Sequence, residues 1–417
     1  MRESPAPSAS SAPSAPPSAA SSAAPEAPLR FEKPIAATLR QGEILLAGAR
    51  RGGDGASLVI TRRAIEGGVV RAIDGPPLAE GATVTDVDWV GGAGALALVV
   101  DTGASVQALF APDVAALGAE KWRPSDAGAC VAGDRLLTLG RADGGFAVSA
   151  LATSGVQESY PVPLGLSSSL ACGAREAAVL VEDGGRRIGR RIGGKEDVPL
   201  ALDDEERGFT LVPAGEAFLA VRLGARGLAF RTLGVAAGPW IRSKLRVADD
   251  ATLELAIATE DVVAVVLSRG AAAARDCPGD EVDAIAELVV VDRASGALRR
   301  DAERLDRWTC GANPGPFFGG AAGDKIVVSW PRGASAACAK LGVRWGGVAW
   351  VTTTGVAPIK VARVDAPAEA LADAGCDEAR CALVALSRGR DGACLPASDP
   401  DAGDVRVISL APLSARS

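Results

Sequence analysis

Histidine is absent from this chain of 417 residues. Without imidazole, Ser-His-Asp and Cys-His catalysis are excluded, and so are zinc, copper and haem sites that need a histidine ligand. Acid–base chemistry by Asp and Glu, lysine Schiff bases and oxygen-ligated Ca²⁺ remain open. The P-loop ending is missing from 48–57, and no G-x-S-x-G motif occurs. We therefore expect a protein without catalytic activity.

Aromatic residues make up only 4% of the chain, and no apolar run approaches the roughly 20 residues that a membrane-spanning helix needs. Gly is abundant, at 50 residues, and 48% of the chain is apolar, which favours many short strands and tight turns. The net charge of −7 gives no reason to expect a nucleic-acid partner. A basic stretch at 186–195 is interpreted as a charge-protected edge strand, with a sulfated glycan or phosphate site as the alternative.

Residues 1–28 are Ser, Ala and Pro with few charges, and they contain no apolar core of a signal peptide. This composition is typical of a disordered, flexible tether. Such tethers often join a lipid anchor to a surface domain. We expect that Met1 replaces a signal or lipid anchor of the precursor and that the protein works outside the cytoplasm.

A short apolar run recurs eight times along the chain, usually just after a small or acidic turn. The runs lie at 44–48, 95–100, 135–140, 177–182, 217–222, 262–268, 325–330 and 381–387. Each is followed by a second extended run, at 57–63, 105–110, 146–151, 187–193, 228–234, 287–293, 347–353 and 404–410. Weaker strands flank these pairs, such as 83–90 before and 360–364 after. The repeating unit is therefore about four strands.

Four strands at a period of roughly 40 to 60 residues resemble the blades of bacterial β-propellers in general. The resemblance covers 29–412 and implies an all-β propeller of eight four-stranded blades. Seven blades, with one unit misread, and two stacked β-domains are the alternatives. The last unit lacks its fourth strand, and Leu29–Ile35 could supply it and close the ring. The Trp-Asp ending of WD40 repeats is missing, so no functional residue carries over.

The connection between the second and third strands is long in the last three units, at 269–286, 331–346 and 388–403. In a propeller these loops emerge on one face, and loops of this length are often functional. The candidate binding residues on this face are Trp308, Asn313, Phe317, Phe318 and Trp345. Trp330 and Trp350 lie within apolar runs, where we expect core packing.

The eight cysteines form no C-x-x-C pair, which favours disulfides and an oxidising compartment. Cys130 and Cys172 occupy equivalent first-strand positions of adjacent units, so we expect them to pair near the channel. Cys376 and Cys381 flank a four-residue turn and could bridge it. The other four, on the long-loop face, are assigned as Cys277–Cys310 and Cys338–Cys394.

Acidic clusters at 276–283 and 399–404 are the only reason to consider a cofactor, which would be Ca²⁺. Their spacing does not fit an EF-hand, so we interpret them as solvated loop charge and expect no cofactor. The leading hypothesis is a monomeric, extracytoplasmic binding or scaffold propeller that holds a protein or glycan on the long-loop face. The alternative is a carbohydrate-active propeller enzyme that uses Asp/Glu pairs such as Asp86 and Asp88.

Overall fold

The structure is a computed structural model, and it describes only part of the chain. The described residues are 30–40, 43–52, 55–64, 71–79, 82–91, 95–126, 128–142, 145–162, 167–183, 186–194, 196–200, 206–233, 238–270, 284–308, 317–322, 325–331, 345–354, 358–365, 369–376, 381–387 and 403–410. This part is all-β apart from one 3-10 turn, η1 (Leu117–Ala119). Within it, no helix has the length and apolar character needed to cross a bilayer.

The strands form antiparallel meanders of consecutive strands, and each meander is named by its strands. β1 (Arg30–Arg40), β2 (Glu43–Gly52), β3 (Gly55–Ala64) and β4 (Arg71–Asp74) come first. β5 (Asp86–Gly91), β6 (Leu96–Asp101), β7 (Val106–Ala111) and β8 (Arg123–Pro124) follow. Next are β9 (Cys130–Ala132), β10 (Arg135–Ala142), β11 (Gly145–Ala152) and β12 (Gln157–Val162). Then come β13 (Ser167–Cys172), β14 (Ala177–Asp183), β15 (Arg186–Arg191) and β16 (Val198–Leu200).

The second half of the chain continues the same pattern. β17 (Gly208–Ala214), β18 (Ala217–Gly224), β19 (Gly227–Leu233) and β20 (Ile241–Arg242) form one meander. β21 (Thr252–Ala258), β22 (Val262–Arg269), β23 (Ala284–Asp292) and β24 (Glu303–Trp308) form the next. They are followed by β25 (Phe318–Ala322), β26 (Lys325–Pro331), β27 (Trp345–Thr352) and β28 (Lys360–Asp365). β29 (Glu369–Cys376), β30 (Cys381–Ser387) and β31 (Gly403–Leu410) end the described chain.

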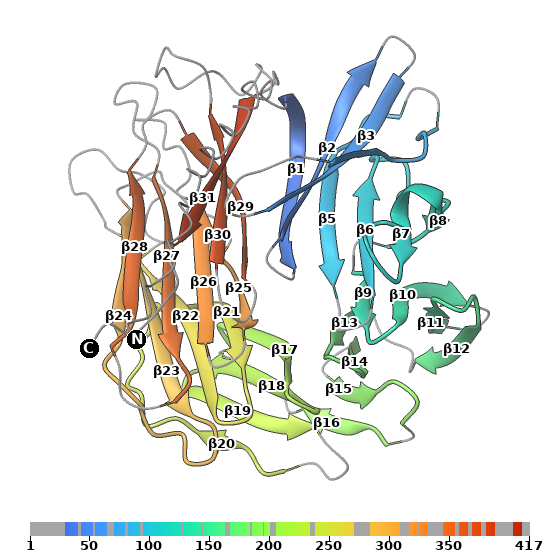
Figure 1. Ribbon diagram of the computed structural model, residues 1–417. Coiled ribbons are helices and arrows are strands. Elements are labelled where there is room, and N and C mark those ends of the chain that lie inside the picture. The colour runs from blue at the N-terminus through green and yellow to red at the C-terminus, as the bar shows by residue number, and fades with distance from the viewer. Residues whose placement is uncertain are drawn as a thin grey trace, which may run out of the picture.

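The meanders stand around a ring as the blades of a β-propeller (Figure 1). The first strand of each meander contacts the first strand of the next, from β1 through β5, β9, β13, β17, β21 and β25 to β29, and β29 contacts β1 again. These first strands therefore surround the central axis, and the later strands of each meander lie progressively further out. The propeller expected from the repeat is confirmed by this topology.

The two ends of the described chain meet in one sheet. Arg30 and Phe31 of β1 pair with Asp404 and Gly403 of β31, while Ile35–Arg40 of the same strand pair with β2. A register shift separates the two parts of β1, and Pro34, which has no backbone N–H, lies within it. The expected closure by Leu29–Ile35 thus takes place through a strand shared by the first and last meanders. Among the described residues this gives six four-stranded sheets and one of seven strands, so a count of eight blades is not established.

The core lies between successive meanders rather than in one centre. Apolar side chains that alternate along the second and third strands fill each gap from the first meander to the seventh. In β22, Ala264 and Val266 pack toward β25–β28, whereas Val263 and Val265 pack toward β17–β20. A second strand buried on both faces has to be apolar at nearly every position, and this explains the recurring apolar runs.

Candidate functional site

Three of the aromatic residues expected at a binding surface begin or end strands at one end of the β21–β24 and β25–β28 meanders. Trp308 is the last residue of β24, Phe318 the first of β25 and Trp345 the first of β27. In an up-and-down meander, the end of the fourth strand, the start of the next first strand and the start of a third strand share one face of the ring. We call this end of the two meanders the aromatic end. The expectation that these residues share a face therefore agrees with the topology.

The side chains behind the aromatic end are tightly packed. Trp330 of β26 is fully buried, and its Nε1 donates a hydrogen bond to Asp306 Oδ2 of the neighbouring meander at 3.1 Å. Phe317 is buried against Trp330, with ring centroids 6.3 Å apart. Phe317, one of the expected binding residues, therefore lies in the core, and a ligand contact by it stays a prediction. The core position expected for Trp330 is correct.

Phe318, next along the chain, points the other way. It is 42% exposed, although large apolar side chains are normally covered. The adjacent residues Gly319 and Gly320 carry no side chain that could cover it. Phe318 is therefore an exposed apolar side chain at the aromatic end.

Several expected site residues lie outside the described residues. These are Asn313 and the cysteines Cys277, Cys310, Cys338 and Cys394, together with most of the three long loops and of the acidic clusters. For Trp308 and Trp345 the structure describes the backbone: Trp308 pairs with Ala284 and Trp345 with Asp365. Cys376 and Cys381 stand directly opposite one another in the β29–β30 ladder, and their pairing stays a prediction.

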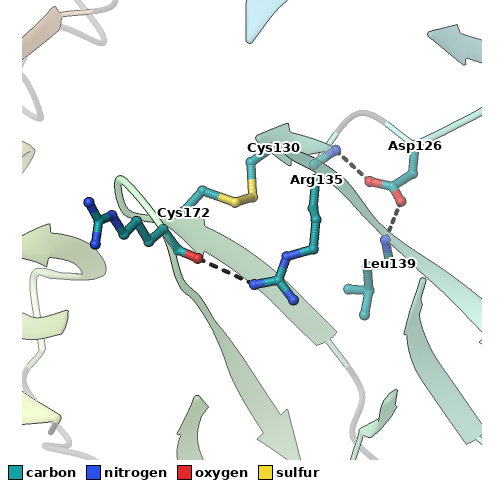
Figure 2. Close-up of a disulfide and its surroundings, with 7 residues drawn as sticks. Asp126, Cys130, Arg135, Leu139 and Cys172 are labelled. Carbon is teal, nitrogen blue, oxygen red and sulfur yellow. Dashed lines mark hydrogen bonds between the residues drawn. A yellow bond between two sulfur atoms is a disulfide. The ribbon is translucent and has the colours of Figure 1, made fainter. Parts of the chain in front are cut away.

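A disulfide joins Cys130 of β9 to Cys172 of β13, with the Cα atoms 5.9 Å apart (Figure 2). This is the pair expected from the equivalent positions of the two cysteines in adjacent units. Asp126 lies beside it, and its carboxylate accepts hydrogen bonds from the backbone N–H groups of Gly128 at 2.8 Å and Leu139 at 2.5 Å. Because β9 pairs with β10 only as far as Leu137, Asp126 supplies the acceptor that β9 does not reach. Partial burial raises the pKa of Asp126.

Two carboxylates, Asp86 and Asp88, lie on the exposed face of β5, one of the strands around the axis. Solvent reaches both side chains, yet the surrounding protein partly desolvates Asp88. This desolvation, together with the like charge of Asp86, raises the pKa of Asp88. Among the described residues, no cluster of three or more Cys, Asp or Glu side chains is arranged to hold a metal ion.

The basic stretch is not an edge strand, because β15 pairs with β14 on one side and β16 on the other. Three of its arginines, Arg187, Arg190 and Arg191, are paired as well. Arg187 is buried, bonds Glu182 and both carboxylate oxygens of Glu206, and stacks over the Phe209 ring at 3.9 Å. Arg190 bonds Asp197 and Arg191 bonds Glu176. The charges therefore stabilise the meander, and they leave little basis for a sulfate or phosphate site.

Sequence reasoning missed a cavity of about 630 Å³ at the opposite end of the propeller from the aromatic end. Its lining includes Arg135, Tyr160, Glu176, Arg191 and Glu196, which come from the β9–β12 and β13–β16 meanders. These residues are separated along the sequence and carry no motif. The one available signal was that Tyr160 is the only tyrosine in the chain.

No family model and no curated protein matches this chain. Among solved structures, it is similar to the β-propeller domain of the Trilobed protease from Pyrococcus furiosus, with a TM-score of 0.45 and 11% identity over 79% of this chain and 99% of that one. TolB from Acinetobacter baumannii matches with a TM-score of 0.35 and 9% identity, over 77% of this chain and 79% of that one. A prolyl endopeptidase structure matches with a TM-score of 0.49 and 13% identity, over 87% of this chain and 54% of that one. Likenesses this distant carry no inference about activity or partners.

Proposed function

We propose that this protein is a non-catalytic, extracytoplasmic binding or scaffold propeller that holds a partner at its aromatic end. The observation that carries the proposal is the exposure of Phe318 at an end where Trp308 and Trp345 also lie. Aromatic side chains at a surface are the residues that most often dominate binding energy. An exposed apolar group favours a protein partner over a free glycan.

The rigidity of the support strengthens this proposal. Phe317, Trp330 and Asp306 connect the two meanders directly beneath the aromatic end. A partner that binds there meets a preformed surface, which lowers the entropy lost on association. The described strands that border 271–283 and 332–344, namely β22, β23, β26 and β27, meet those segments at the same end.

A location outside the cytoplasm is supported by the Cys130–Cys172 disulfide. Disulfides persist in oxidising compartments and are rare in the reducing cytosol. We further propose eight blades within residues 29–412, in which β29–β31 form the last blade and the start of β1 completes it. The contact of β29 with β1, after seven contacts from one first strand to the next, supports this count. The tether at 1–28 and the monomeric state remain predictions.

The test compares the protein with two variants on immobilised supports exposed to extracytoplasmic proteins of its own organism. Phe318→Ser should release the proteins that the unmodified chain retains, with an affinity loss of about 30-fold, as expected for an aromatic hot spot. Leu298→Ser is the matched control, because Leu298 is 44% exposed and lies in the turn between β23 and β24 at the opposite end. Equal retention by Phe318→Ser, or binding of a glycan panel alone, would contradict the proposal.

A second candidate is an Asp/Glu-dependent carbohydrate-active enzyme. It is favoured by one observation, the raised pKa of Asp88 beside Asp86 on a strand that lines the axis. Glycosidases need one carboxyl group that stays protonated and a second that stays ionised. Hydrolysis of a neutral glycan by the protein, abolished by Asp88→Asn, would support this candidate. An unreactive panel would leave the binding proposal in place.

A further inference from the structure

The cavity between the β9–β12 and β13–β16 meanders has the size of a small-molecule site. Its volume of about 630 Å³ falls within the range of roughly 300 to 1,000 Å³ that is usual for ligand pockets. It opens where the first and second strands, and the third and fourth strands, are joined. The aromatic end carries the other connections, so the two surfaces are separate.

The walls of the cavity are held in place on both sides. The Cys130–Cys172 disulfide joins the two meanders at their first strands. The N–H of Gly133 also donates to the carbonyl of Ala174 at 2.9 Å, and Arg135 Nη2 donates to the carbonyl of Arg175 at 3.3 Å. These bonds link the β9–β10 turn directly to the β13–β14 turn. A ligand would therefore find a cavity that is already formed.

Local backbone geometry leaves room beside the single tyrosine. The turn after β15 is closed by a hydrogen bond from Gly194 N to Arg191 O at 3.0 Å, and Gly193 within it has a φ of 79°. A side chain at Gly193 would point at the Tyr160 ring, because a Cβ there would be 3.8 Å from Cε1. Because Gly193 and Gly194 have no side chains, the turn leaves that side of the Tyr160 ring uncovered.

The charges around the cavity are compensated. Arg135 lies 3.8 Å from Glu158, and Tyr160 donates its hydroxyl hydrogen bond to the same carboxylate. Arg191 forms an ion pair with Glu176, and Glu196 adds a further carboxylate. A phosphate or sulfate would need uncompensated positive charge, which these pairs do not offer. An isolated cation would have to compete with the arginines for Glu158 and Glu176.

Paired guanidinium and carboxylate groups still have unused hydrogen-bonding capacity. A guanidinium has five N–H donors and a carboxylate about four acceptor sites, so each pair can present donors and acceptors side by side. Hydroxyl groups, which both donate and accept, match such an array. Ile192, Val198 and Leu233 supply apolar wall next to it, which suits the C–H face of a sugar ring.

We propose that this cavity binds a neutral saccharide, held by Arg135, Arg191 and Glu196 and packed against Tyr160. The inference does not depend on the partner proposed for the aromatic end. Failure of one would leave the other untouched, because the two sites lie at opposite ends of the ring.

The single tyrosine makes the test site-specific. Protein labelled with 3-fluorotyrosine carries one fluorine, at Tyr160, and its ¹⁹F resonance is followed while neutral monosaccharides and trisaccharides of glucose, galactose and N-acetylglucosamine are added. The expected result is a saturable shift with at least one of these sugars and none with sodium sulfate at matched ionic strength. No shift with any sugar up to tens of millimolar, or a saturable shift with sulfate, would overturn the proposal.

Variants separate binding from a change of fold. Glu196→Gln and Arg191→Gln should each weaken the sugar titration by about tenfold, the equivalent of one lost hydrogen bond to a charged group. Glu216→Gln is the control, because Glu216 is exposed in the β17–β18 turn at the same end and does not line the cavity. The free energy of unfolding of each variant should differ from that of the parent by no more than the small amount that an exposed ion pair usually contributes. Unchanged titrations with both cavity variants would count against the assigned site.

Discussion

At the scale of single residues, contacts across sheets decide what a side chain does. Phe317 and Phe318 are adjacent and chemically identical, yet one is buried against Trp330 and the other is 42% exposed. Their different roles follow from the alternation of side chains at the start of β25. A single neighbour also sets the pKa of Tyr160 and the space available at Gly347, and a prediction follows for each residue.

The pKa of Tyr160 should lie above its ordinary value of about 10, because its hydroxyl donates a hydrogen bond to the Glu158 carboxylate and ionisation would break that bond. Absorbance titration of the phenol reads Tyr160 alone, since the chain has one Tyr. Glu158→Gln should lower the measured pKa toward the ordinary value. Glu176→Gln, which alters a different ion pair of the same cavity, should leave it in place. An identical titration curve for Glu158→Gln would show that another group sets the shift.

Gly347 has no side chain because the Trp330 indole occupies that space. The two residues pair directly across β26 and β27, and a Cβ on Gly347 would lie 2.6 Å from Cε2 and 2.7 Å from Cη2 of the ring. Gly347→Ala should therefore lower the free energy of unfolding by about 1–3 kcal/mol through overpacking, measured by urea denaturation. Gly320→Ala in the neighbouring strand β25 is the control, since nothing lies within 4 Å of its added Cβ. Similar unfolding midpoints for the two variants would contradict this account.

At the scale of the element, hairpin turns are held by carboxylates. Asp292 closes the β23–β24 turn: its side chain accepts hydrogen bonds from the N–H groups of Ala294 and Ser295, and it also binds the Arg299 guanidinium at 2.9 Å. Arg299 and the Ser295 hydroxyl lower the pKa of Asp292 to about 2. Asp126 plays a comparable part at β10, where it extends a ladder that β9 leaves short.

The lowered pKa of Asp292 predicts a pH dependence of stability. The carboxyl group titrates near 3.9 in the unfolded chain and at about 2 in the folded one, so its stabilising effect is complete above pH 5 and is lost as the pH falls toward 2. Because solvent partly screens this half-buried pair, we expect a contribution of about 1 kcal/mol. Asp292→Asn should be less stable than the parent at pH 6 and close to it near pH 2, by urea denaturation. Asp301→Asn, a change at an exposed neighbour, is the control and should have the same free energy of unfolding as the parent at both pH values. If Asp292→Asn were destabilised equally at pH 6 and pH 2, titration of Asp292 would not explain its effect.

At the scale of the whole molecule, stability depends on tying successive meanders together. Apolar layers fill the described interfaces between meanders. The Cys130–Cys172 bond adds a covalent link near the axis and closes a loop with a sequence separation of 42. Restricting a loop of that length in the unfolded chain is worth about 2–4 kcal/mol.

Removing this link should destabilise the ring. The double variant Cys130→Ser with Cys172→Ser is expected to lose about 2–4 kcal/mol of unfolding free energy in non-reducing buffer, measured by urea denaturation. In the presence of dithiothreitol the parent and the variant should unfold at nearly the same urea concentration, because both then lack the bond. A difference that persists under reduction would assign the effect to side-chain packing.

Much of the architecture could be predicted from the sequence because it follows from local pattern. A second strand covered on both faces must be apolar, so runs such as 262–268 and 381–387 marked β22 and β30 closely. Repetition then placed Cys130 and Cys172 at equivalent positions of neighbouring units, and hence side by side. Closure through residues near Arg30 followed from the missing last strand.

The tertiary structure alone decided which side chains meet across the gaps between meanders. The arginines of β15 were interpreted as charges that protect an edge strand, whereas Arg187, Arg190 and Arg191 form ion pairs with Glu182, Glu206, Asp197 and Glu176. The cavity around Tyr160 and the burial of Phe317 arise in the same way, from residues far apart in the sequence. A strand pattern depends on neighbours along the chain, whereas a binding site depends on distances between strands that no local pattern encodes.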